Sequence, residues 1–151
     1  MAMKETERSL RWFFLITGGL TVIMALGSIG DLSKLSHAPT RLIAPLWFST
    51  ISHLVLGAGF VLAGMKLKAA LLTGARWIQR LVLLAGVSLV VELAWTYSVF
   101  HEFAAASDRD AEFTGTAIGV VIRLAVVAYL YASVRRLSGE AQVRTASTTF
   151  E

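Results

Sequence analysis

The stretch WIQRLVLLAGVSLVVELAWTYSVF, residues 77–100, decides the fold. It is apolar over the roughly 20 residues that a helix needs to cross a bilayer, yet it carries a carboxylate, Glu92. A soluble bundle would show a charged stripe along each helix, and no alternation typical of strands persists. The sequence therefore predicts an all-α, integral membrane four-helix bundle within residues 1–136. The four predicted spans are residues 12–30, 42–65, 77–100 and 114–134.

The composition supports a lipid environment and excludes several classes of protein. Hydrophobic residues make up 56% of the 151 residues and charged residues 16%, whereas about a quarter is charged in a usual soluble domain. The absence of cysteine excludes disulfide frameworks, zinc–cysteine sites, iron–sulfur clusters and c-type haem attachment. The formal charge of +4 comes from short basic clusters that form no continuous face, so no nucleic acid partner is expected.

Basic residues predict the orientation of the spans. They cluster before the first span, between the second and third, and after the fourth, at Lys4, Arg8, Arg11, Lys66, Lys68, Arg76, Arg80, Arg135, Arg136 and Arg144. The other two connections hold only Lys34, Arg41 and Arg109. The positive-inside rule then places both termini in the cytoplasm.

A cleaved signal peptide is the rival interpretation of the first span, which is longer than the usual apolar region of 7 to 15 residues. Residues 137–151 are polar and are predicted to form a disordered cytoplasmic tail.

Three titratable residues lie inside the predicted spans: His53, Glu92 and Arg123. An ionisable side chain in the bilayer is costly, so it normally faces the bundle interior and has a partner there. With a rise of 1.5 Å per residue, Glu92 lies about 12 Å, Arg123 about 13 Å and His53 roughly 15 Å below the outer boundary. The three residues thus share one layer, and we predict that they form a catalytic site.

Polar and aromatic residues on the same helix edges are the predicted substrate-binding residues. They are Thr21, Ser49, Phe60, Ser88, Trp95, Thr96 and Thr116. Thr21 is at about the same depth as Arg123, and Phe60 and Trp95 would give a ligand an apolar wall. Close packing of helices is the alternative explanation, because small and hydroxyl residues let membrane helices approach each other.

The chemistry of the layer depends on how far Glu92 lies from Arg123. A close pair would be a structural ion pair that keeps Glu92 ionised and makes it a poor general acid. A separated Glu92 could act as an acid or base. In a third arrangement Arg123 binds a ligand anion or carbonyl through its planar fork, while Glu92 and His53 move a proton.

The third arrangement suits a small lipophilic or partly anionic ligand, such as a quinone-, isoprenoid- or sterol-like compound. The acid–base chemistry would be of the isomerase or cyclase type, or quinone-linked. Two alternatives stay open. One is a non-catalytic subunit or assembly factor of a larger membrane complex, and the other is a proton-coupled transporter. Four helices are few for alternating access, so such a transporter would act as a homo-oligomer, in the simplest case a dimer.

Neither a metal nor a cofactor is predicted. Haem ligation by two histidines needs both at one depth on facing helices, but His37 and His101 lie at or beyond the outer boundary. A metal site of these two with Glu102 would require two separate segments to converge. Because the alternatives include non-catalytic functions, the sequence leaves open whether the protein is an enzyme.

One stretch suggests a family. The first span ends in Gly30-Asp31-Leu32-Ser33-Lys34-Leu35, with Pro39 shortly after, and this stretch resembles the DoxX-like group of small four-span bacterial membrane proteins. The resemblance covers the first span and the following loop. It implies a four-helix bundle in a bacterial inner (plasma) membrane and, for some relatives, association with quinone-linked oxidation. It assigns no role to Glu92 or Arg123.

Overall fold

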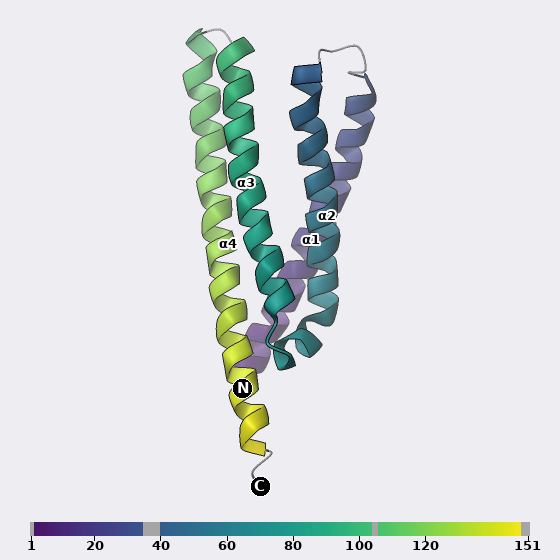
Figure 1. Ribbon diagram of the computed structural model, residues 1–151, viewed down its shortest axis with the longest axis vertical. Coiled ribbons are helices and arrows are strands. Elements are labelled where there is room, and N and C mark those ends of the chain that lie inside the picture. The colour runs from purple at the N-terminus through teal and green to yellow at the C-terminus, as the bar shows by residue number, and fades with distance from the viewer. Residues whose placement is uncertain (1, 35–39, 104–105, 149–151) are drawn as a thin grey trace.

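The computed structural model describes residues 2–34, 40–103 and 106–148, which are almost entirely helical (Figure 1). These residues form helices α1 (Ala2–Lys34), α2 (Thr40–Leu72), α3 (Arg76–Phe103) and α4 (Ala106–Thr148). No strand occurs within the described ranges. The prediction of an all-α fold with four helices is therefore confirmed for this part of the chain.

Each of these helices contains a segment long and apolar enough to cross a membrane. The segments are Lys4–Gly30, Ile43–Leu72, Arg76–Ser98 and Ala117–Val143. Large apolar side chains cover the outside of the molecule; Ile23 is 66% exposed and Val121 is 65% exposed. Soluble monomers rarely expose apolar surface on this scale. Both the helices and their surface are those of a multi-pass membrane protein.

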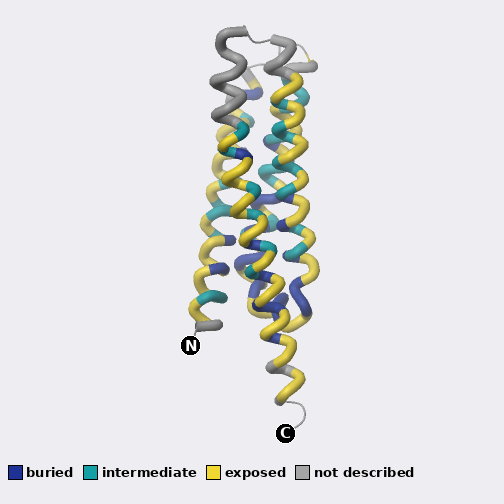
Figure 2. The backbone as a smooth tube through the Cα atoms, turned by 90° about the vertical axis from the view of Figure 1, so that its left-hand side faces the viewer, coloured by how far each residue is buried: buried dark blue, intermediate teal, exposed yellow. Residues whose placement is uncertain are grey.

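The helices form two hairpins, α1 with α2 and α3 with α4. Figure 1 shows the hairpins together at the end that carries both termini and apart towards the other end. Buried residues concentrate in the half near the termini, as the dark blue segments of Figure 2 show. This core includes Phe14 of α1, Leu67 of α2, Ile78 of α3 and Val134 of α4, each completely buried. One end of the bundle is thus well packed, and the other is more open.

A tight turn joins the two hairpins at the packed end. Gly74 adopts φ +89°, a conformation that favours glycine. The backbone N–H of Ala75 donates to the carbonyl of Ala70 at 2.7 Å, and that of Gly74 donates to Leu71 at 3.3 Å. This pair of bonds is a Schellman motif, which satisfies the last carbonyls of α2 and lets the chain reverse into α3.

Helices α1 and α2 approach each other through glycines. A Cβ atom added at Gly18 would lie 2.7 Å from both the carbonyl oxygen of Gly57 and the backbone nitrogen of Val61. A Cβ added at Gly64 would lie 3.0 Å from the carbonyl oxygen of Arg11. The two backbones are therefore in direct contact, as small residues allow in membrane helix pairs.

Helix α4 continues past the boundary predicted at residue 136, through Thr148. The predicted disordered tail is therefore helical up to that residue. Leu137, Ser138 and Ala141 are buried, with exposed fractions of 1%, 4% and 8%. Leu137 and Ala141 extend the buried face of Val134 at helical spacing and belong to the same core as Ala70, Leu71 and Ala75 at the turn. Packing against this turn gives a polar segment the buried contacts that its composition does not indicate.

Candidate functional site

A cavity of about 440 Å³ lies directly above the packed core, with walls from all four helices. Leu56, Phe60, Ala85 and Leu130 belong both to the core and to the cavity wall, so they form its floor. The remaining wall residues are Phe13, Thr17, Thr21, Met24, Ala25, Ser28, Ser49, Thr50, His53, Ser88, Leu89, Glu92, Ile122, Arg123, Val126 and Val127. The wall is thus mostly apolar, with a few polar groups.

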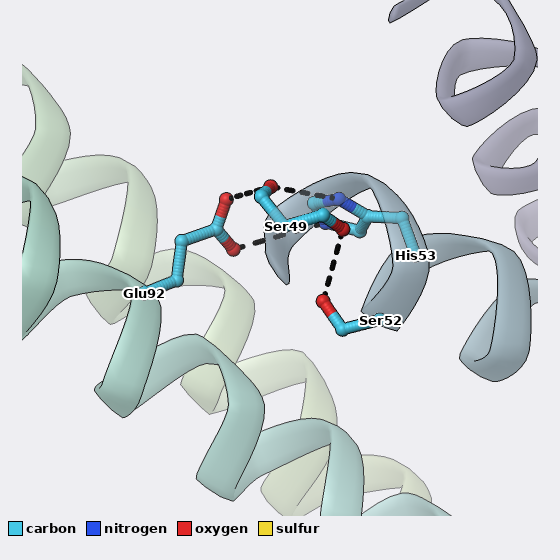
Figure 3. Close-up of polar contacts among 4 residues, drawn as sticks. All are labelled: Ser49, Ser52, His53 and Glu92. Carbon is cyan, nitrogen blue, oxygen red and sulfur yellow. Dashed lines mark hydrogen bonds and ion pairs between the residues drawn. The ribbon is translucent and has the colours of Figure 1, made fainter. Parts of the chain in front are cut away.

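Ser49, His53 and Glu92 form a polar cluster in one wall of the cavity (Figure 3). The hydroxyl of Ser49 donates to Oε1 of Glu92 at 2.6 Å, and its Oγ lies 3.2 Å from Nδ1 of His53. Nε2 of His53 lies 3.8 Å from Oε2 of Glu92. The serine thus stands between the two titratable side chains, and together they link α2 to α3.

Helical geometry explains why these three residues meet. Ser49 and His53 are four residues apart on α2, so their side chains lie on one face, one turn apart. Glu92 reaches that face from α3. The side chains of His53 and Glu92 are 33% and 25% exposed, so both are half-buried and both remain accessible from the cavity.

Arg123 lines the same cavity from α4, but it stands apart from the polar cluster. In the described part of the chain, no ion pair joins its guanidinium to the carboxylate of Glu92, whose partners are Ser49 and His53. Arg123 is an exposed residue. Of the arrangements considered from the sequence, the geometry is therefore that of a separated glutamate and arginine.

The predicted substrate-binding residues divide into two groups. Thr21, Ser49, Phe60 and Ser88 line the cavity. Phe60 is 8% exposed, and its ring centroid lies 5.6 Å from that of Phe14. The hydroxyl of Thr21 donates to the carbonyl of Thr17, one turn earlier on α1, at 2.7 Å.

The other three residues do not belong to the described wall. Trp95 is not among the wall residues, and its ring centroid lies 5.6 Å from that of Phe48 on α2. Thr96 is half-buried outside the wall. The side chain of Thr116 lies outside the described residues. Trp95 and Thr96 are about one turn beyond Glu92 on α3, so sharing a helix edge with Glu92 is not enough to make a residue part of the cavity wall.

Some wall residues are not among the predicted substrate-binding residues. Thr50 is only 4% exposed and lines the cavity next to Ser49, and Thr17 lines it one turn from Thr21. The spacing of four between Thr17 and Thr21 was a usable indication of a shared face. For Val126 and Val127 no such indication exists, because a valine facing a cavity and one facing lipid look alike in the sequence.

The described residues contain no group of three or more side chains suited to a metal ion. His37 lies outside the described residues, as do the side chains of His101 and Glu102, so the outer metal site considered above falls outside this part of the chain. In the cavity wall, His53 and Glu92 contact each other, and both contact Ser49.

The chain matches no protein-family model, no curated protein and no solved structure. The resemblance of residues 30–39 to the DoxX-like group therefore stays a prediction. Polar side chains that meet in a mostly apolar cavity are typical of small-molecule sites, which makes this cavity the candidate functional site.

Proposed function

We propose that the protein is a multi-pass protein of a bacterial inner membrane with both termini in the cytoplasm. Both termini lie at one end of the bundle, as an even number of spans requires (Figures 1 and 2). Arg8, Lys66, Arg76 and Arg135 belong to helix segments at that same end, and the positive-inside rule assigns a basic end to the cytoplasm. The assignment to a bacterial inner membrane rests on the resemblance to the DoxX-like group.

Within this membrane the protein binds a small lipophilic ligand that carries a polar head. The observation that carries the proposal is the cavity, whose mostly apolar wall includes His53 of α2, Glu92 of α3 and Arg123 of α4. Its volume of about 440 Å³ lies in the range of about 300 to 1,000 Å³ that small-molecule sites occupy. The phenylalanines of the floor and wall would receive the apolar part of a quinone-, isoprenoid- or sterol-like molecule, and the polar residues would receive its head.

The polar cluster also gives the site acid–base chemistry. His53 and Glu92 are the pair that can take a proton from a bound molecule or return one to it, and Arg123 can orient a carbonyl or anion through its planar fork. Proton transfer of this kind serves an isomerase or cyclase, or a quinone-linked reaction. Ser49 holds the imidazole and the carboxylate in place through its two contacts.

Binding of representative ligands tests the proposal. The protein in phosphatidylcholine nanodiscs would be titrated with decylubiquinone, which quenches tryptophan fluorescence, and the quinone would then be displaced with farnesol or cholesterol. We expect at least one probe to bind, and Glu92→Gln and Arg123→Ala to weaken its binding about tenfold, the effect of losing one charged contact. Matched controls are Glu140→Gln and Arg135→Ala, which change exposed residues of the same types outside the cavity wall. Wild-type binding in both folded cavity variants would refute the proposed site.

A further inference from the structure

The contacts of Ser49 constrain where the hydrogens of the polar cluster lie. A serine hydroxyl carries one hydrogen, and here it donates to Oε1 of Glu92 at 2.6 Å. The 3.2 Å contact between the same Oγ and Nδ1 of His53 must then use a hydrogen on Nδ1. If the hydroxyl instead donates to Nδ1, the contact with Glu92 requires a proton on the carboxyl group.

The direct contact between His53 and Glu92 further constrains where the hydrogens lie. With a hydrogen on Nδ1, a bare Nε2 would lie 3.8 Å from Oε2 of Glu92 with no hydrogen between the two acceptors, an unfavourable contact if the carboxylate is ionised. The contact is favourable when Nε2 also carries a hydrogen, or when Oε2 does. In each favourable arrangement His53 and Glu92 together hold one extra proton, so the cluster has no net charge.

A neutral cluster leaves the cavity with one positive charge. The charged and titratable side chains of its described wall are His53 on α2, Glu92 on α3 and Arg123 on α4, and α1 contributes none. Since His53 balances Glu92, nothing in that wall balances the guanidinium of Arg123. An unpaired charge inside a membrane is costly, and a bound counter-charge would remove that cost.

We propose that the ligand of this cavity is an amphiphile with an apolar chain and one negatively charged head, which binds Arg123. The inference rests on the proposed function and narrows its ligand to anions. A carboxylate or phosphate head matches the two-pronged donor geometry of a guanidinium. In this proposal, the apolar chain of the ligand lies against Phe13, Phe60 and Leu130 of the apolar wall. A free fatty acid and an anionic phospholipid both supply this chemistry.

Three probes with one chain and different heads test the charge preference. Oleate, oleyl alcohol and oleylamine would compete with decylubiquinone for the protein in phosphatidylcholine nanodiscs, with empty discs correcting for partition into lipid. We expect oleate to bind about tenfold or more tightly than oleyl alcohol, and oleylamine most weakly. In Arg123→Gln the ratio of oleate to alcohol affinity falls to about one, while the alcohol still binds. Arg135→Gln, on the same helix but outside the cavity wall, keeps the wild-type ratio.

The outcomes separate this inference from the proposed function. Equal binding of oleate and oleyl alcohol by the wild type, or a preserved ratio in Arg123→Gln, would overturn the anionic ligand while the lipophilic site stands. If neither these probes nor those of the first experiment bind, both proposals fail. Discs containing phosphatidylglycerol identify the source of the anion. Weaker oleate binding in such discs, in the wild type but not in Arg123→Gln, identifies a phospholipid head, and unchanged binding identifies a single-chain anion.

The hydrogen count has its own test. Nitrogen-15 NMR of histidine-labelled protein, assigned by the signals lost in His53→Asn, reports which ring nitrogens of His53 carry hydrogens. Infrared difference spectroscopy against Glu92→Gln reports whether the carboxyl group is protonated. We expect either an imidazolium with an ionised Glu92 or a neutral imidazole with a protonated Glu92. A neutral imidazole together with an ionised Glu92 would contradict the neutral cluster.

Discussion

Helix α2 contacts α1 and α3 in contrasting ways. Against α1 it presents glycines, and a Cβ atom at Gly18 would lie 2.7 Å from backbone atoms of α2. Against α3 it presents Ser49 and His53, whose contacts with Glu92 are made by half-buried side chains beside a cavity. The first interface leaves no space between backbones, whereas the second keeps its helices far enough apart for a ligand. A closely packed hairpin thus lies on one side of α2, and a polar site beside a cavity lies on the other.

The largest effect is expected from breaking the glycine interface. Gly18→Leu would force a side chain between the backbones of α1 and α2, and we expect a loss of about 3 kcal/mol in the free energy of unfolding, at the upper end for overpacking. Unfolding by sodium dodecyl sulfate, followed by circular dichroism in mixed micelles, would measure it. Gly19→Leu is the matched control, because a Cβ at that position meets nothing within 4 Å. Equal stability of the two variants would show that the close approach is not tight.

A smaller effect is expected at the polar interface. Ser49→Ala removes the hydroxyl that contacts both Glu92 and His53, and leaving such groups without this partner costs about 1 to 2 kcal/mol. Ser52→Ala is the control, because the hydroxyl of Ser52 donates only to the backbone carbonyl of Ser49, at 2.9 Å, and its loss should cost less than about 0.5 kcal/mol. The same unfolding assay applies. If Ser52→Ala costs as much as Ser49→Ala, the bridging role assigned to Ser49 is incorrect.

The smallest effect is expected at the turn between the hairpins, which belongs to neither interface. Gly74→Ala places a side chain at φ +89°, and we expect a cost of about 1 kcal/mol, the lower end for alanine in a left-handed conformation. The added Cβ would also lie 3.0 Å from Nε2 of Gln142, a flexible side-chain end that can move aside. Binding of decylubiquinone should stay unchanged in this variant. A variant that keeps its stability but loses binding would show that the turn acts on the cavity directly.

The sequence predicted the parts of this structure that depend on distance along a helix. Apolar runs located the helices, and a rise of 1.5 Å per residue placed His53 and Glu92 at similar depths, where the structure brings them into contact. It did not predict rotation about the helix axis, which depends on how neighbouring helices pack. For this reason Trp95, one turn from Glu92, packs on Phe48 outside the cavity, and the position of Ser49 between Glu92 and His53 was not foreseen.

The extension of α4 was missed for a related reason. Residues 137–148 are rich in serine and threonine, and composition alone gives them little to bury. Leu137 and Ala141 are buried in a core that also contains Ala70 and Ala75 at the turn between α2 and α3, far away in the sequence. A contact of this kind is a property of the folded arrangement and is invisible to any local pattern.

The buried end of α4 has a practical consequence for handling the protein. Leu137 and Ala141 belong to the packed core, so a version shortened after Arg136 would uncover apolar atoms next to Ala70 and Ala75. Purification tags and fluorescent fusions are therefore best attached after residue 148. If such a shortened version aggregates in detergent, the loss of these core residues explains the aggregation.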